Sequence, residues 1–77
     1  MRIRLYGRLA DAIAPEIELT AAGSTVGEVR RRLAADHAGA ANLLARSRAL
    51  IADRAVDDGQ AVGESDELEF LPPVSGG

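Results

Sequence analysis

Hydrophobic and polar residues alternate in two stretches near the start of the chain. Residues 1–6 carry apolar side chains at the odd positions, and two arginines and Tyr6 at the even positions. Residues 16–20 alternate in the same way. Because a period of two is typical of a half-buried strand, the pattern predicts two strands that pair as a hairpin. Between them, residues 7–14 are rich in helix formers, and we expect Pro15 to end a short helix there.

A third alternation lies at residues 67–71. It turns Leu68 and Phe70 toward the core and leaves Leu71 on the exposed face with two glutamates. The short apolar run 49–52 is compatible with a buried strand. The hydrophobic pattern therefore predicts two further strands in the second half of the chain.

The apolar positions change to a helical spacing in the middle of the chain. Thr25 and Glu28 have the spacing of a capping box. A single apolar stripe follows, formed by Val26, Val29, Leu33 and Ala34. We therefore predict a main helix over residues 26–35 and a shorter one near 39–44. The three arginines at 30–32 are off the stripe, and we expect them on the outer, solvated face.

The predicted elements follow the order strand, strand, helix, strand, strand. A chain of 77 residues has room for one domain, and strands that flank a helix then pack as two layers. We expect an α+β fold of the ubiquitin-like β-grasp type, with a mixed four- to five-stranded sheet packed on one main helix. This domain would occupy residues 1–71 and leave residues 72–77 as an extended, flexible C-terminal tail.

The composition argues against several classes of function. The net charge is −3, and Tyr6 and Phe70 are the only aromatic residues, which is not typical of a nucleic-acid binder. The chain has no cysteine, and hence no disulfide, thiol nucleophile or cysteine zinc site. No stretch approaches the ~20 apolar residues of a membrane span. We expect a cytoplasmic protein that binds neither nucleic acid nor membrane, with its two aromatic side chains as core or interface anchors.

All nine basic residues are arginine, and lysine is absent. A genomic preference for arginine codons is the simpler explanation. A functional explanation is that the chain then has no side-chain amine to attack an activated acyl group of its own. The second explanation has weight only if the chain carries such a group.

The predicted domain lacks the pattern of an enzyme's active site. His37 is the only histidine, has no acidic cluster that would complete a metal site, and is expected at the surface near a helix end. The serines have no evident base, which nucleophilic catalysis requires. Gly23 and Gly27 lack the spacing and the lysine of a phosphate loop. The C-terminal segment is left as the candidate site, and no metal ligands are expected.

That segment consists of Pro72, Pro73, Val74, Ser75, Gly76 and Gly77. Pro72 has no N–H, so strand pairing should end after Leu71, and two successive prolines hold the chain extended. Glycine has no Cβ, so Gly76 and Gly77 can enter a channel too narrow for other residues. A terminal carboxylate at Gly77 would be unhindered. Once activated as an acyl-adenylate, it could be converted to a thiocarboxylate by a sulfur nucleophile.

The ending ELEFLPPVSGG resembles that of the small subunit of molybdopterin synthase, the MoaD family of sulfur carriers. The opening MRIRLYGRL and the length are similar to that family as well. The resemblance implies that a ubiquitin-activating-type adenylyltransferase uses ATP to adenylate Gly77, and that sulfur transfer then gives the thiocarboxylate. The carrier would bind no cofactor and have no active site of its own. It would donate sulfur to a pterin precursor in molybdenum cofactor biosynthesis, within a heterotetramer with the large catalytic subunit.

The resemblance also assigns roles to individual residues. Gly77 would be the reactive residue and Gly76 its channel-fitting neighbour. The inserted tail would further comprise Ser75, Val74, Pro73 and Pro72. As weaker candidates for core and docking contacts we name Tyr6, Phe70 and Leu71.

Three other interpretations stay open. A carrier of the same kind could serve thiazole, cysteine or tRNA thiolation, although those tails usually lack Pro-Pro-Val-Ser before Gly-Gly. A ubiquitin-like modifier could be joined to lysines of its targets through Gly77, without building chains on lysines of its own. A plain interaction domain with a slack tail is the last alternative.

Overall fold

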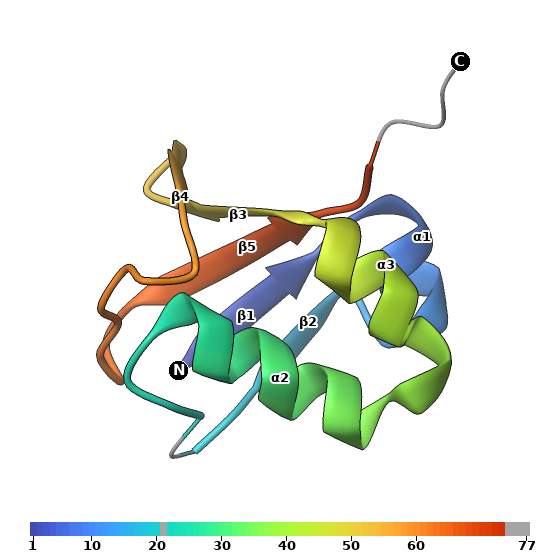
Figure 1. The fold of residues 1–77 in the computed structure, drawn as a ribbon, viewed down its shortest axis with the longest axis horizontal. Coiled ribbons are helices and arrows are strands. Elements are labelled where there is room, and N and C mark those ends of the chain that lie inside the picture. Colours follow the sequence, from blue (N-terminus) through green and yellow to red (C-terminus); the bar gives the residue numbers. More distant parts are fainter. Residues whose placement is uncertain (21, 74–77) are drawn as a thin grey trace.

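The computed structural model describes residues 1–20 and 22–73 as a sheet with helices packed on one of its faces (Figure 1). The strands are β1 (Arg2–Leu5), β2 (Glu16–Glu18), β3 (Arg48–Ile51), β4 (Arg54–Val56) and β5 (Glu67–Leu71). The helices are α1 (Gly7–Ala12), α2 (Val26–Asp36) and α3 (Ala41–Arg46), with a 3-10 turn η1 (Ala38–Ala40) between the last two.

The five strands of this described sheet lie in the order β2-β1-β5-β3-β4. At its centre, β1 and β5 run parallel and pair Leu5 with Phe70, whereas all other neighbouring strands are antiparallel. A parallel pair requires a crossover connection, and the chain between β1 and β5 includes α2 on the face of the sheet (Figure 1). This mixed sheet packed on a main helix confirms the predicted ubiquitin-like β-grasp fold.

The main helix confirms the sequence pattern closely. It begins at Val26 as predicted and ends one residue later than predicted, at Asp36. Both bonds of the capping box are formed. The N–H of Glu28 donates to Thr25 Oγ1 at 3.2 Å, and the N–H of Thr25 donates to Glu28 Oε1 at 3.1 Å.

Strand β5 has the predicted bounds, but the existence of β4 was not specifically predicted. β4 is three residues long and pairs with β3 through a tight turn at Ala52 and Asp53. Both turn residues have positive φ angles, 51° and 64°. Such hairpin turns usually carry Asn-Gly or Asp-Gly, so this turn gave no recognisable signal in the sequence.

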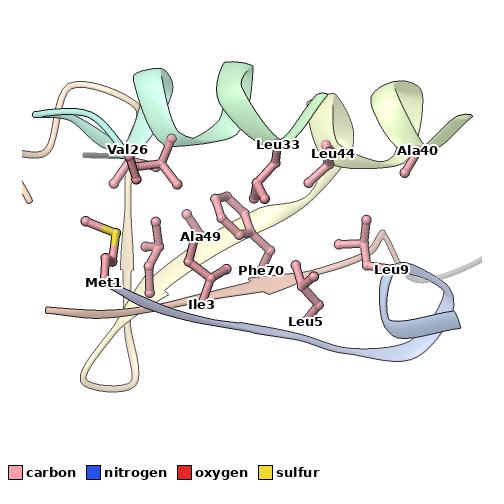
Figure 2. Packing of buried hydrophobic residues seen from close by; sticks show 13 residues of the cluster. Met1, Ile3, Leu5, Leu9, Val26, Leu33, Ala40, Leu44, Ala49 and Phe70 are labelled. Carbon is pink, nitrogen blue, oxygen red and sulfur yellow. The ribbon is translucent and has the colours of Figure 1, made fainter. Parts of the chain in front are cut away.

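The core lies between the sheet and the helices α2 and α3 (Figure 2). Side chains of β1 and β5 point up from the sheet toward those of Val26, Leu33 and Leu44. The largest fully buried side chains are Phe70, Ile3, Leu9, Leu33, Leu44, Leu68, Val26 and Val29. Burying each of these side chains stabilises the folded state by about 1.5–3 kcal/mol. Phe70 is among them, so it belongs to the core and is not an exposed contact.

Arg30 departs from the prediction that all three helix arginines lie on the solvated face. Its side chain is only 14% exposed. The guanidinium donates to the carbonyl oxygens of Leu44 and Ser47 and to Ser47 Oγ at 2.8 Å, and it pairs with Asp58 at 3.0 Å. Its Cζ also lies 5.1 Å from the centre of the Phe70 ring. Residue 30 is one helical turn from both Val26 and Leu33, which places it at the border of the apolar stripe.

Replacing Arg30 with alanine should lower the free energy of unfolding by about 2–4 kcal/mol, because two backbone carbonyls lose charged donors and the ring loses its cation. Urea denaturation measures this change. Arg31→Ala, at an exposed position of the same helix, is the matched control and should change stability by less than about 0.5 kcal/mol. Equal stability of the two variants would contradict the role given to Arg30.

Candidate functional site

The site begins where strand pairing ends. β5 makes its last pair with β3 at Leu71, opposite Arg48, and the N–H of Tyr6 donates to the Phe70 carbonyl at 3.3 Å. Pro72 follows and has no N–H to continue the ladder. The predicted tail residues Pro72 and Pro73 are half-buried, whereas Val74, Ser75, Gly76 and Gly77 lie outside the described residues.

Gly7 determines how closely the chain can pass after β5. Its φ is +54°, a value in the left-handed region that favours glycine. A Cβ at this position would lie only 3.1 Å from Cγ of Pro72. Gly7 therefore makes room for Pro72 as well as for the bend between β1 and α1, a role that the sequence analysis missed.

Two large apolar side chains, Tyr6 and Leu71, are exposed next to this point, at 39% and 37%. Both follow the alternation of their strands and lie on the face of the sheet away from the helices. The Tyr6 hydroxyl donates to Glu69 Oε2 at 2.5 Å. Of the three residues named for core and docking contacts, Tyr6 and Leu71 are thus accessible to a partner. Phe70 is fully buried, so the structure excludes it as a direct docking contact.

The same open face carries charged residues that pair across strands. Arg4 contacts Glu67 at 2.9 Å, and Arg2 contacts Glu16 at 3.3 Å. These pairs are exposed and contribute little to stability. The opposite charges within each pair neutralise each other. The part of this face formed by β1 and β2 therefore has little unpaired charge.

A shallow groove of about 330 Å³ lies beside the first residues after β5. We call it the tail-root groove, and it is lined by Arg46, Arg48, Leu71, Pro72 and Pro73. The sequence analysis missed both arginines. Their proximity depends on the antiparallel register of β3 with β5, which the sequence pattern does not specify.

Another surface depression of the described residues lies away from the end of β5. It has a volume of about 430 Å³, lies against the β3–β4 hairpin and is lined by Ile51, Ala52, Arg54, Ala55, Val56, Asp57 and Gln60. His37 is half-buried where α2 ends. No group of three His, Cys, Asp or Glu side chains among residues 1–20 and 22–73 is placed to hold a metal ion. In the same ranges, no helix has both the length and the apolar character needed to span a membrane.

The fold is a ubiquitin-like β-grasp domain, and its last strand continues into Pro72 and Pro73. The model of the ThiS family matches residues 3–77, and the chain therefore belongs to the ThiS family. This is a family of ubiquitin-like sulfur carriers that work with activating enzymes and partner proteins.

Solved structures from Haloferax volcanii have the same fold. The crystal structure of SAMP1 has a TM-score of 0.74 at 24% identity, with 99% of this chain and 97% of that chain covered. A crystal structure of small archaeal modifier protein 1 gives 0.73 at 23% identity, with 95% of each chain covered. The solution structure of the HVO 2177 protein gives 0.81 at 25% identity, with 99% and 84% covered. No curated protein matches the sequence.

Gly7→Ala should lower the free energy of unfolding by about 1–2 kcal/mol, because alanine is strained at positive φ and its methyl group crowds Pro72. Urea denaturation measures the loss. Gly39→Ala is the matched control, since a Cβ there meets nothing within 4 Å, and it should be neutral or slightly stabilising. A Gly7 variant as stable as the Gly39 variant would refute the close approach of Pro72.

Tyr6 should ionise only above its ordinary pKa of 10.0, because its hydrogen bond to Glu69, and then desolvation, raise the pKa, while Arg4 acts in the opposite sense. The resulting stabilisation is complete below the ordinary pKa and is lost as pH rises through the pKa of the folded state. Tyr6 is the only tyrosine and the chain has no tryptophan, so an ultraviolet absorbance titration follows it alone.

Glu69→Gln should move the pKa of Tyr6 back toward its ordinary value. Glu18→Gln, whose carboxylate contacts Arg2 instead, is the control and should leave the titration unchanged. A Tyr6 titration that is the same in both variants would show that Glu69 does not hold the hydroxyl in solution.

Proposed function

We propose that the chain is the sulfur carrier subunit of molybdopterin synthase. The observation that carries the proposal is the continuation of β5 into Pro72 and Pro73 in a ThiS-family chain that ends ELEFLPPVSGG. Residues 1–71 form the carrier domain and residues 72–77 its tail. Six residues reach at most about 20 Å, which is far enough to place Gly77 inside another protein.

The chemistry takes place on the carboxylate of Gly77. One of its oxygens attacks the α-phosphate of ATP on a ubiquitin-activating-type adenylyltransferase, and the step releases pyrophosphate and leaves an acyl-adenylate. Sulfide-level sulfur delivered by a donor then attacks the carbonyl carbon, the bond from that carbon to the AMP oxygen breaks, and AMP leaves as the thiocarboxylate forms on Gly77. The carrier contributes no side chain to these steps and binds no cofactor itself.

The domain directs the tail and presents docking contacts. Tyr6 and Leu71 are exposed at the end of β1 and β5, beside the point where the tail departs. Burying such side chains against the large catalytic subunit would position Pro72 to Gly77 in its channel. There the thiocarboxylate sulfur is transferred to a pterin precursor, within a heterotetramer of two carriers and two large subunits.

Carriers for thiazole, cysteine or tRNA thiolation share every step up to the thiocarboxylate. A second function of a different class is protein modification, and the fold similarity to small archaeal modifier protein 1 favours it. In that case a lysine amine of a target attacks the activated Gly77. The chain itself has no lysine, so conjugates would not extend through its side chains.

The test is the intact mass of the protein after incubation with ATP, the activating enzyme and a sulfur donor. We expect one oxygen to be replaced by sulfur, and we expect the product to support molybdopterin formation with the large subunit. Deletion of Gly77 should leave the unfolding free energy unchanged and abolish both results.

The other outcomes separate the alternatives. A thiocarboxylate that supports only another thiolation pathway would transfer the assignment to that pathway. Conjugates on other proteins that survive reducing agent would favour the modifier function. Synthase activity retained after deletion of Gly77 would refute the reactive residue named here.

A further inference from the structure

The tail-root groove combines an apolar wall with two arginines. Leu71, Pro72 and Pro73 supply the apolar part, and Arg46 at the end of α3 and Arg48 at the start of β3 supply the cations. Both arginines are exposed. None of the described residues that line this groove is acidic.

Both arginines of this groove lack an ion-pair partner among the described residues, as do Arg8, Arg31 and Arg54, whereas the other four arginines are paired. Arg2, Arg4, Arg30 and Arg32 each form an ion pair with a carboxylate of the chain. Arg46 and Arg48 have no ion-pair partner within residues 1–20 and 22–73, although acidic residues outnumber basic ones by 12 to 9. Two unpaired cations beside the tail of an acidic protein form a local patch of the opposite sign, which complements a negatively charged surface.

Any protein that encloses the tail must also cover its root. Pro72 and Pro73 are at once the first tail residues and part of the groove wall. In the proposed function the first such protein is the adenylyltransferase. A guanidinium binds a carboxylate through two parallel hydrogen bonds. Leu71 and the two prolines form an apolar surface, which complements an aliphatic side chain that lies between two carboxylates of the partner.

We infer that the tail-root groove docks an acidic segment of the activating adenylyltransferase, in which carboxylates pair with Arg46 and Arg48 and an apolar side chain packs on Leu71. The inference rests on the proposed activation of Gly77. The groove holds only a few side chains, so it acts as a recognition contact within a larger interface. It affects how well the carrier binds and not the chemistry on Gly77.

ATP–pyrophosphate exchange, measured with the adenylyltransferase of the source organism that activates the wild-type chain, tests the inference. Arg46→Ala and Arg48→Ala should each raise the KM for the carrier by up to about fivefold, and the double variant by about 20-fold, with kcat unchanged. The matched control is Arg54→Ala, which should keep the wild-type KM; Arg54 is exposed on β4 and has no ion-pair partner among the described residues.

Charge reversal separates electrostatics from packing. The double variant R46E/R48E should raise KM further than R46A/R48A, and added salt should shrink the difference between wild type and R46A/R48A. Urea denaturation of each variant checks that the fold is kept.

The experiment distinguishes a failure of the proposed function from a failure of the groove inference. If the wild-type chain is not adenylated by any such enzyme, both the proposed function and the groove inference fall. If it is adenylated and the KM of R46A/R48A equals that of wild type or of R54A, the groove inference is wrong and the proposed function stands. A fall in kcat of R46A/R48A at unchanged KM would also overturn the inference. An equal rise in KM for R46A/R48A and R46E/R48E would overturn it as well.

Discussion

The parallel pairing of β1 with β5 is the constraint on which the rest of the structure depends. It places the first strand beside the last and makes both end at the same edge of the sheet. The residues that follow β1 therefore meet the end of β5: Tyr6 hydrogen-bonds to Phe70, and Gly7 lies against Pro72. The surroundings of the tail are thus built from both ends of the chain, and the intervening crossover supplies the helices that bury the other face.

Alternation along β5 connects this edge to the core. Phe70 points into the core, beneath the guanidinium of Arg30, and the next residue, Leu71, points outward. Arg30 also joins α2 to α3 through the carbonyl oxygen of Leu44, and to the connection between α3 and β3 through the carbonyl oxygen of Ser47. The strand that leads to Pro72 is consequently held by its pairing with β1 and β3 and by the contact of Arg30 with Phe70.

The sequence predicts what depends on local periodicity and misses what depends on register. The alternation around Phe70 and the capping box at Thr25 are local, and both are confirmed. The hairpin turn at Ala52 and Asp53 adopts positive φ without glycine, so β4 had no local signal. Likewise, the groove needs Arg48 opposite Leu71, a pairing between residues 23 positions apart. Arg30 was misplaced because it lies at the border of an apolar stripe, where tertiary contacts decide its exposure.

A domain of this size explains why the reactive group of the proposed carrier lies outside it. A small domain buries only about 60% of its unfolded surface, and here the buried hydrophobic residues form one core between sheet and helix. Enclosure of a reactive intermediate must then come from the partner. In the proposed function the domain would contribute direction, through Gly7 and Pro72, and recognition, through the residues at the root of the tail. Carrier and modifier functions share these requirements, and they differ only in the nucleophile that the partner brings to the activated carboxylate: sulfur in one case, an amine in the other.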